Sequence, residues 1–270
     1  MKLMSHNSRE TCCVVAIGRD VVCTPEGNPV LPVSLARDIV SPSSSLLAVP
    51  ADREGITENE PSHLLAGWAS PDASLPGGLT RRNLRSLFGT VDEPAFWSAG
   101  HAFQLAHWDR SHQYCGWCGG PTKLDSGELA RQCEECGRSV YPRISPAVIV
   151  AVIRDRTLLL AHNARRSHAF YSVLAGFVEP GETLEECVVR EVREEVNVTV
   201  GNVRYVRSQP WPFPDALMIA FTAEYVEGEI EVDGTEIDHA YWCGPHELPH
   251  VPPRPSVARA LIDRFVEMFG

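Results

Sequence analysis

The chain has 270 residues, of which 44% are hydrophobic and 22% charged, the composition of a soluble globular protein with room for about two domains. Its formal net charge of −11 argues against a broad nucleic-acid-binding face, because phosphate contacts draw on clustered lysines and arginines. No apolar run approaches the roughly 20 residues of a membrane span and the first residues lack the apolar core of a signal peptide, so we expect a cytoplasmic protein that contacts no membrane.

Residues 1–110 form the first predicted region, an N-terminal α+β domain. Short apolar stretches, CCVVAI from Cys12 and SLLAVP from Ser45, alternate with turn-rich segments and predict strands. Between Glu93 and Arg110 apolar residues recur every three or four positions, which predicts an amphipathic helix. The pattern of this region points to no particular chemistry.

Residues 111–141 form the second predicted region, a compact module built around two C-x2-C pairs. Each pair makes a tight turn whose two sulfurs point at one spot, and four thiolates around a point form a tetrahedral site that suits zinc. A redox role is the alternative interpretation, but a single C-x-x-C pair serves for that chemistry. We therefore expect a closed, structural zinc site with these ligands: Cys115, Cys118, Cys133 and Cys136.

The other cysteines show no such spacing, and we expect them to be small buried hydrophobic residues. Zinc ribbons often bind nucleic acid, which is a competing function of a different class. In this ribbon Lys123, Arg131 and Arg138 are offset by nearby acidic residues, so the charge balance does not favour nucleic-acid binding.

The third predicted region, residues 142–270, has alternating strand and helix patterns. Two apolar runs on either side of a turn at 154–156 predict paired strands, and further strands are predicted at 203–208 and 217–225. A last helix is predicted from Ser256 to Met268.

A glutamate-rich segment, residues 176–198, is the strongest signal in this region. Thr183 followed by Glu186 forms a capping box and predicts the start of a helix, and Asn197 tolerates the left-handed conformation that ends one. Apolar residues repeat every four positions between these limits, which predicts a helix face buried in a core.

Glu191, Glu194 and Glu195 are spaced so that their carboxylates share one face of this helix. Like charges at such spacing destabilise a helix by about 0.2–0.5 kcal/mol per pair, and we expect Arg190 to offset part of this by pairing with Glu186 and Glu194. A solvated charged face is the alternative interpretation.

The loop before the helix, GFVEPGE, favours a metal site instead. Gly176 and Gly181 let the backbone turn and bring Glu182 to the start of the helix. Loop and helix together then make a cup of oxygen ligands of the kind that holds Mg²⁺ or Mn²⁺ against a phosphate.

This segment resembles the Nudix box, G-x5-E-x7-R-E-U-x-E-E-x-G-U, where U is an aliphatic residue. The matching residues are Gly176, Glu182, Arg190, Glu191, Val192, Glu194, Glu195 and Val198. Asn197 stands where the family has glycine, and we expect the geometry to survive because asparagine is the next best residue for a left-handed helix end. The resemblance implies an α/β/α sandwich that hydrolyses a nucleoside diphosphate linked to another group.

A second stretch, SQPWPFPDALM from Ser208, alternates prolines with aromatic residues. It either presents rigid aromatic faces to a flat ring or forms a proline-rich surface loop that packs its own aromatics. The stretch resembles SQPWPFPxS, the signature of NADH pyrophosphatases within the Nudix hydrolases. Ala216 replaces the final serine of that signature, which puts one hydrogen bond to substrate in doubt, worth about 1 kcal/mol.

The resemblance also implies the residues of the site. The Mg²⁺ or Mn²⁺ ligands are expected to be the carbonyl of Ala175 and the carboxylates of Glu191, Glu195 and Glu236. The implied substrate contacts are Glu128, Tyr141, Gln209, Pro210, Trp211, Pro212, Phe213, Pro214, Asp215, Ala216 and Ala258.

Two assignments stay open at this point. Either Glu194 or Glu195 is expected to act as the base that takes a proton from the attacking water. Phe177 either stacks on the nicotinamide ring or belongs to the core of a strand.

The family implies a homodimeric, zinc-containing hydrolase that uses Mg²⁺ or Mn²⁺ to cleave the pyrophosphate of NAD(H) into nicotinamide mononucleotide and AMP, and that removes NAD caps from RNA 5′ ends. One alternative is a Nudix hydrolase of ADP-ribose or dinucleoside polyphosphates. Another is a non-catalytic zinc-ribbon protein that binds nucleotide or RNA.

Overall fold

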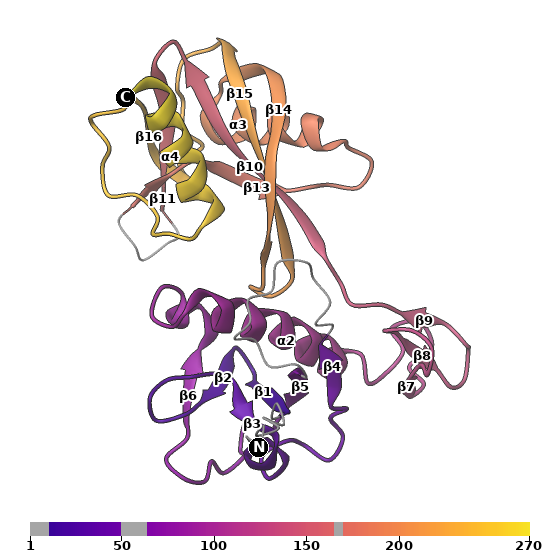
Figure 1. Cartoon of the computed structure of the whole chain (residues 1–270). Coiled ribbons are helices and arrows are strands. Elements are labelled where there is room, and N and C mark those ends of the chain that lie inside the picture. Colours follow the sequence, from indigo (N-terminus) through magenta and orange to yellow (C-terminus); the bar gives the residue numbers. More distant parts are fainter. Residues whose placement is uncertain (1–10, 50–63, 165–169) are drawn as a thin grey trace, which may run out of the picture. The chain divides into compact units, whose positions relative to one another are not determined.

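The computed structural model describes residues 11–49, 64–164 and 170–270 (Figure 1). These residues form two compact units, each with its own core. The first unit contains the described residues up to Arg143 together with Pro212–Pro214, and the second contains those of Ile144–Trp211 and Asp215–Gly270. No helix in the described part of the chain is long and apolar enough to cross a membrane.

The first unit contains a six-stranded sheet with the order β4-β5-β1-β2-β6, in which β3 pairs with β1. β1 and β5 run parallel, and the other pairs are antiparallel. Its strands are β1 (Cys12–Ile17), β2 (Asp20–Cys23), β3 (Leu31–Pro32), β4 (Leu47–Val49), β5 (Leu64–Trp68) and β6 (Thr80–Asn83). The predicted strands at CCVVAI and SLLAVP are confirmed as β1 and β4, although Pro50 lies outside the described residues.

Two short helices and one long helix accompany this sheet: α1 (Val33–Arg37), the 3-10 helix η1 (Leu84–Leu87) and α2 (Glu93–Ser111). α2 begins where the Asp92 side chain accepts the N–H of Ala95, and it confirms the predicted helix. Phe96, Phe103 and Trp108 lie in the core of this unit. Buried residues occur on more than one stripe of α2, so it is less amphipathic than its periodicity predicts.

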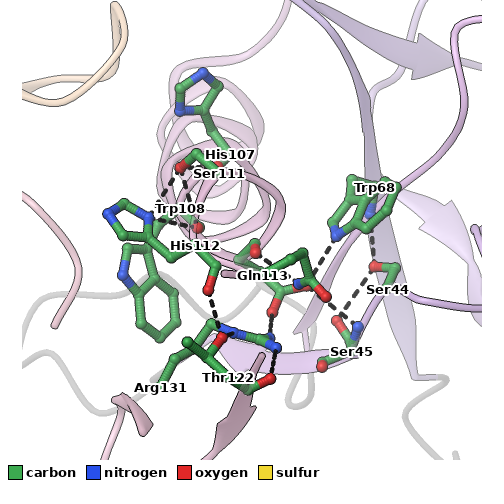
Figure 2. Close-up of polar contacts among 11 residues, drawn as sticks. Ser44, Ser45, Trp68, His107, Trp108, Ser111, His112, Gln113, Thr122 and Arg131 are labelled. Carbon is green, nitrogen blue, oxygen red and sulfur yellow. Dashed lines mark hydrogen bonds and ion pairs between the residues drawn. The ribbon is translucent and has the colours of Figure 1, made fainter. Parts of the chain in front are cut away.

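A buried ion pair lies near the end of α2 (Figure 2). Asp109, which is 0% exposed, pairs with Arg131, which is 4% exposed. Asp109 Oδ2 also accepts the indole N–H of Trp68 at 2.8 Å, and Arg131 Nε donates to Thr122 Oγ1 at 2.8 Å. Because a buried charge is stable only when it is paired and hydrogen-bonded, this network fixes α2 to β5 and to the neighbouring ribbon.

The ribbon is a small antiparallel sheet with the order β7-β8-β9. Its strands are β7 (Thr122–Leu124), β8 (Arg131–Cys133) and β9 (Ser139–Val140). The sheet is too small to bury a core of its own, so other forces must hold it together.

The second unit is built on a seven-stranded mixed sheet. Its order is β12-β11-β10-β15-β14, with β13 paired to β10 and β16 paired to β11. Its strands are β10 (Ser145–Arg154), β11 (Thr157–Asn163), β12 (Tyr171–Ser172), β13 (Leu174–Phe177), β14 (Thr199–Trp211), β15 (Ala216–Glu227) and β16 (Ile237–Cys243). The predicted pair of strands around 154–156 is confirmed, and the two predicted later strands are longer than the sequence indicates.

Helices α3 (Leu184–Val196) and α4 (Val257–Phe269) cover opposite faces of this sheet. Val188 and Val192 of α3 pack into one core, and Leu261 and Phe265 of α4 pack into the other. Alternate residues of β11 divide between the two cores, as the two-residue period of a strand requires. This arrangement is the α/β/α sandwich, and both helices begin and end within a residue or two of the predicted limits.

Candidate active site

The glutamate helix α3 has the ends that its sequence predicts. The Thr183 side chain accepts the N–H of Glu186, while the Glu186 carboxylate accepts the N–H of Thr183 at 2.7 Å. Asn197 closes the helix in the left-handed conformation with φ 58°, and its side chain donates to Glu231 Oε2 at 3.2 Å. Asparagine therefore takes the conformation for which the family motif uses glycine.

Arg190 ties three carboxylates together. Its guanidinium lies 2.6 Å from Glu182 Oε1, 2.9 Å from Glu191 Oε1 and 3.0 Å from Glu194 Oε2. The expected pairing with Glu194 is confirmed, but the expected pairing with Glu186 is wrong, because the Glu186 carboxylate caps the helix at Thr183. The charge cluster is thus held by an internal cation and is not simply a solvated face.

Gly176 on β13 leaves space for the side chain of Glu191. An added Cβ at position 176 would lie only 1.9 Å from Glu191 Cδ. Burial raises the pKa of the Glu191 carboxyl, and the charges of Glu194 and Glu236 act in the same direction, while Arg190 opposes them. Glu236, from a loop before β16, thus lies within electrostatic range of Glu191.

The three clustered glutamates of α3 differ in exposure. Glu195 is only 8% exposed, whereas the Glu194 side chain is 61% exposed and Glu191 is half-buried. Exposure suits Glu194 to proton exchange with water, and burial suits Glu195 to a fixed ligand role. The choice between them as the base stays a prediction.

A turn built on Asp233 sets the position of Glu236. Asp233 Oδ2 accepts the N–H of Glu236 at 2.9 Å, and Asp233 Oδ1 accepts the N–H of Ile237 at 2.7 Å. The Thr235 hydroxyl also donates to Asp233, and together these donors hold the pKa of Asp233 at about 2. The backbone N–H of Asp233 bonds the carbonyl of Glu195 at 3.2 Å, which ties this turn to the end of α3.

Ala175 and Phe177 flank Gly176 on β13. Ala175 is half-buried and pairs with Ile149 of β10. Phe177 is 59% exposed, which favours a stacking surface over a core position. Its carbonyl accepts a hydrogen bond from Arg190 at 3.0 Å, so the backbone there is fixed while the ring is free to meet a ligand.

The donor set around α3 fits a hard divalent cation. Carboxylate oxygens are the ligands that Mg²⁺ and Mn²⁺ prefer, and Glu191, Glu195 and Glu236 supply them together with the space at Gly176. Across the described ranges, the group of potential ligands whose donor atoms all lie within 4.8 Å of one another is a different one, the four cysteines. The glutamate oxygens are spread more widely, and Arg190 holds one of these side chains, that of Glu191.

The four cysteines of the ribbon do converge. Sγ atoms lie 3.7 Å apart for Cys115 and Cys136 and 3.5 Å apart for Cys118 and Cys133. Backbone N–H groups of Cys118 and Trp117 lower the pKa of Cys115 to about 6, and the N–H groups of the second turn likewise lower the pKa of Cys133. In Cys115 and Cys133 the turns thus stabilise the thiolate, the form of cysteine that binds zinc, whereas hydrogen bonds with the other thiols raise the pKa of Cys118 to about 12. Of the other cysteines, Cys12 is half-buried and the rest are buried.

Two predicted substrate contacts of the first unit touch each other. Tyr141 is exposed, and its hydroxyl donates to Glu128 Oε2 at 2.7 Å. This carboxylate raises the pKa of Tyr141. Both residues belong to the ribbon of the first unit. That they bind the same substrate as the glutamates of the second unit stays a prediction.

The proline-aromatic segment forms the turn between β14 and β15. Gln209 is buried, donates to the carbonyl of Pro255 at 2.9 Å and accepts the N–H of Val257 at 2.8 Å. Ala216 is buried and pairs with Trp211 across the hairpin. Ala258 is buried near the start of α4.

The tip of the segment clusters with the first unit. The Phe213 ring lies 6.4 Å from that of Phe96, and the Arg85 guanidinium lies 4.5 Å from the Phe213 ring centre. Pro212 is buried against Gly100, and Pro214 is exposed. Pro210 pairs with Leu217 as part of β14, and Asp215 is the last residue of the turn before β15. The aromatic ring of Phe213 is therefore packed against other side chains, as expected for a proline-rich loop that packs its aromatic residues.

The sequence does not predict two features of the site, the contact of Arg190 with Glu182 and the role of Asp233. Glu182 and Arg190 occupy fixed positions of the family motif, so the motif itself is the signal for them. Asp233 has a weaker signal, the Asp-Gly turn before Glu236.

A sandwich of two helices around a mixed sheet, with a glutamate-rich helix held by one arginine, defines a hydrolase of the Nudix fold. The NUDIX domain model matches residues 143–265, and the NADH pyrophosphatase zinc ribbon domain model matches residues 110–141. A crystal structure of a NUDIX hydrolase from Nitrosomonas europaea, 23% identical in sequence, has the same fold with a TM-score of 0.51 over 57% of this chain and 90% of that chain.

Curated relatives are similar over most of their length. The chain is 44% identical over 212 residues to the NAD-capped RNA hydrolase NudC of Pseudomonas fluorescens, which is 78% of this chain and 76% of the relative. It is 46% identical over 192 residues to the NAD-capped RNA hydrolase NudC of Deinococcus radiodurans, which is 70% of this chain and 69% of the relative. The chain therefore belongs to the Nudix hydrolases, in the group that carries the NADH pyrophosphatase zinc ribbon.

Proposed function

We propose that this Nudix hydrolase cleaves the pyrophosphate of NAD(H) into nicotinamide mononucleotide and AMP and removes NAD caps from RNA 5′ ends. One observation carries the proposal: a complete Nudix glutamate helix and an NADH pyrophosphatase zinc ribbon occur in the same chain. The relatives from Pseudomonas fluorescens and Deinococcus radiodurans are named NAD-capped RNA hydrolases.

The residues of α3 and its surroundings account for the chemistry. A bound Mg²⁺ or Mn²⁺ neutralises pyrophosphate charge and lowers the pKa of water. Glu191, Glu195 and Glu236, with the Ala175 carbonyl, are the proposed ligands. Glu194 or Glu195 takes the proton of the water that attacks phosphorus in line. Arg190 keeps these carboxylates oriented through its contacts with Glu191 and Glu194.

Substrate recognition is assigned to aromatic and polar groups near these carboxylates and in the ribbon. The exposed ring of Phe177 is suited to stack on nicotinamide. Phe177 comes directly after Gly176 on β13, so its ring lies close to the proposed metal site. The Tyr141–Glu128 pair and the segment from Gln209 to Ala216, together with Ala258, are the other proposed contacts.

Three further properties belong to the same proposal. The catalytic ion is Mg²⁺ or Mn²⁺, and the working enzyme is a homodimer, as the resemblance implies. A cytoplasmic location agrees with four ribbon thiolates that bind zinc, because free thiols persist in a reducing compartment.

The direct test compares turnover of NADH, ADP-ribose and an NAD-capped RNA with Mn²⁺ present, for the wild type, Glu195→Gln and Glu185→Gln. Glu185 lies exposed in the first turn of the same helix, so its variant is a matched control. We expect NADH and capped RNA to be cleaved, Glu195→Gln to be inactive and Glu185→Gln to match the wild type. Faster turnover of ADP-ribose points to the alternative hydrolase, and no turnover of any substrate points to a binding protein.

A further inference from the structure

A cavity of about 380 Å³ lies between β14 and α4 in the second unit, and the proposed reaction makes no use of it. Val206 and Ala260 supply apolar surface, and the charged groups of the lining are Arg207, Arg254, Asp263, Arg264 and Glu267. The chain has a net charge of −11, so a group of three arginines around one cavity indicates a site for an anionic ligand.

The arginines of the cavity differ in their partners. Arg254 is neutralised by Asp263, whose carboxylate lies 2.8 Å from Arg254 Nη2 and 2.7 Å from Arg259 Nε. Among the described residues, neither Arg207 nor Arg264 has a carboxylate within ion-pair distance. Two guanidinium groups therefore remain able to bind an anion at the cavity.

The chemistry of the lining indicates a phosphate attached to an organic group. Guanidinium forks bind phosphate through two parallel hydrogen bonds, while Val206 and Ala260 offer apolar contact to a sugar or base. A simple inorganic anion needs no such apolar wall.

The cavity lies beside residues assigned to the substrate. Arg207 and Gln209 are two positions apart on β14, within a stretch of regular pairing to β15, so they share one face of the strand. The Gln209 side chain bonds Pro255 and Val257, which directly follow Arg254 and begin α4. The same two elements thus carry the cavity and, next to it, Gln209 and Ala258.

We propose that this cavity binds a backbone phosphate of the RNA chain that follows the NAD cap. The proposal rests on the proposed function, in which the RNA continues from the adenosine half of the cap. Arg207 and Arg264 hold the phosphate, and Val206 and Ala260 contact the adjoining nucleotide. A local pair of arginines in this way allows a strongly acidic chain to retain an RNA 5′ end.

The test measures binding of a 5′-monophosphorylated RNA oligonucleotide to the full-length, EDTA-treated protein by fluorescence anisotropy at several salt concentrations. Arg207→Glu and Arg264→Glu are each expected to weaken binding about tenfold, the loss of a charge-assisted hydrogen bond, and to reduce the salt slope by about 1. Arg204→Glu is the matched control, because Arg204 is an exposed arginine on the same strand that does not line the cavity, and its Nε donates to Asn202 Oδ1 at 3.0 Å. Glu267→Gln should tighten binding.

Turnover of NADH provides the second readout. We expect Arg207→Glu and Arg264→Glu to leave kcat/KM for NADH unchanged and to raise KM for NAD-capped RNA. Equal weakening by Arg204→Glu, or unchanged RNA affinity in both cavity variants, overturns the assignment. A tenfold loss of AMP affinity in Arg207→Glu without any loss of RNA affinity also overturns it, because a free nucleotide is then the occupant.

The two proposals fail in different ways. If the wild type does not release NAD from capped RNA, the decapping part of the proposed function is wrong. The anisotropy titration needs no cleavage and still decides whether the cavity binds RNA.

Discussion

At position 176 a glycine leaves room for the carboxylate of Glu191, since an added Cβ would lie 1.9 Å from Glu191 Cδ. Gly176→Ala should therefore displace this carboxylate and lower turnover of NADH about 100-fold, the usual effect of a misplacement of about 1 Å. Gly201→Ala is the control, because its Cβ would meet only Val226 Cγ2 at 3.2 Å. Equal turnover in the two variants would show that Glu191 needs no fixed position.

The turn at Asp233 acts through Glu236. Asp233→Ala removes the acceptor for the N–H of Glu236, so we expect the Mn²⁺ concentration for half-maximal turnover to rise about 10- to 100-fold, as for other groups that orient metal ligands. Asp233→Asn keeps an acceptor and should have an intermediate effect. Glu229→Ala removes one exposed charge from the same loop and should behave like the wild type. An unchanged Mn²⁺ requirement in Asp233→Ala would contradict the positioning role.

At the scale of elements, Arg190 joins the loop of Glu182 to helix α3. Its hydrogen bond lowers the pKa of Glu182 to about 2, below the ordinary value of 4.5. A lowered pKa in the folded state stabilises the protein above pH 4.5, and the stabilisation is lost as the pH falls toward 2. The difference in unfolding free energy between wild type and Arg190→Gln should therefore be large at pH 7 and shrink below pH 4.5, measured by denaturant titration. A pH-independent difference would assign the effect to packing alone.

The pair of Asp109 and Arg131 joins α2 to the ribbon. Asp109→Asn leaves a buried guanidinium without its counter-charge and should lower the free energy of unfolding by about 3–5 kcal/mol. The double variant Asp109→Leu/Arg131→Met should recover most of the loss. Lys123→Ala, which breaks an exposed pair with Glu134, should cost less than about 1 kcal/mol. Urea unfolding of the three variants checks this, and equal losses for buried and exposed pairs would refute it.

The elements that the sequence predicts correctly are those whose signals lie in neighbouring residues. The limits of α3 follow from Thr183 and Asn197, because a capping box and a left-handed end are written in neighbouring residues. The pairing of Asp109 with Arg131 and the position of Glu236 beside Glu191 depend on contacts between distant segments, which no local pattern contains. The same distinction explains the wrong pairing of Arg190 with Glu186, since helix spacing allows it but the loop supplies Glu182 instead.

For the whole molecule, two sets of ligands of opposite character should respond differently to chelation. The four cysteines Cys115, Cys118, Cys133 and Cys136 suit zinc, whereas the glutamates of the second unit are the proposed ligands of Mg²⁺ or Mn²⁺. Brief EDTA treatment should abolish NADH turnover, leave zinc bound, and be reversed by Mn²⁺, because a closed four-sulfur site exchanges slowly and an open oxygen site exchanges fast.

In contrast to EDTA treatment, which should leave zinc bound, Cys133→Ser should release the zinc of the ribbon. Cys133 is buried in the ribbon, and loss of this ligand should remove zinc and destabilise the first unit, because zinc binding contributes directly to the folding of so small a sheet. Metal analysis of the purified variant, combined with thermal unfolding with and without added zinc, checks this. EDTA could instead remove zinc as fast as it removes activity, with zinc alone restoring turnover. In that case the ribbon would be the catalytic centre, and the assignment of a structural role to zinc and a catalytic role to Mg²⁺ or Mn²⁺ would be wrong.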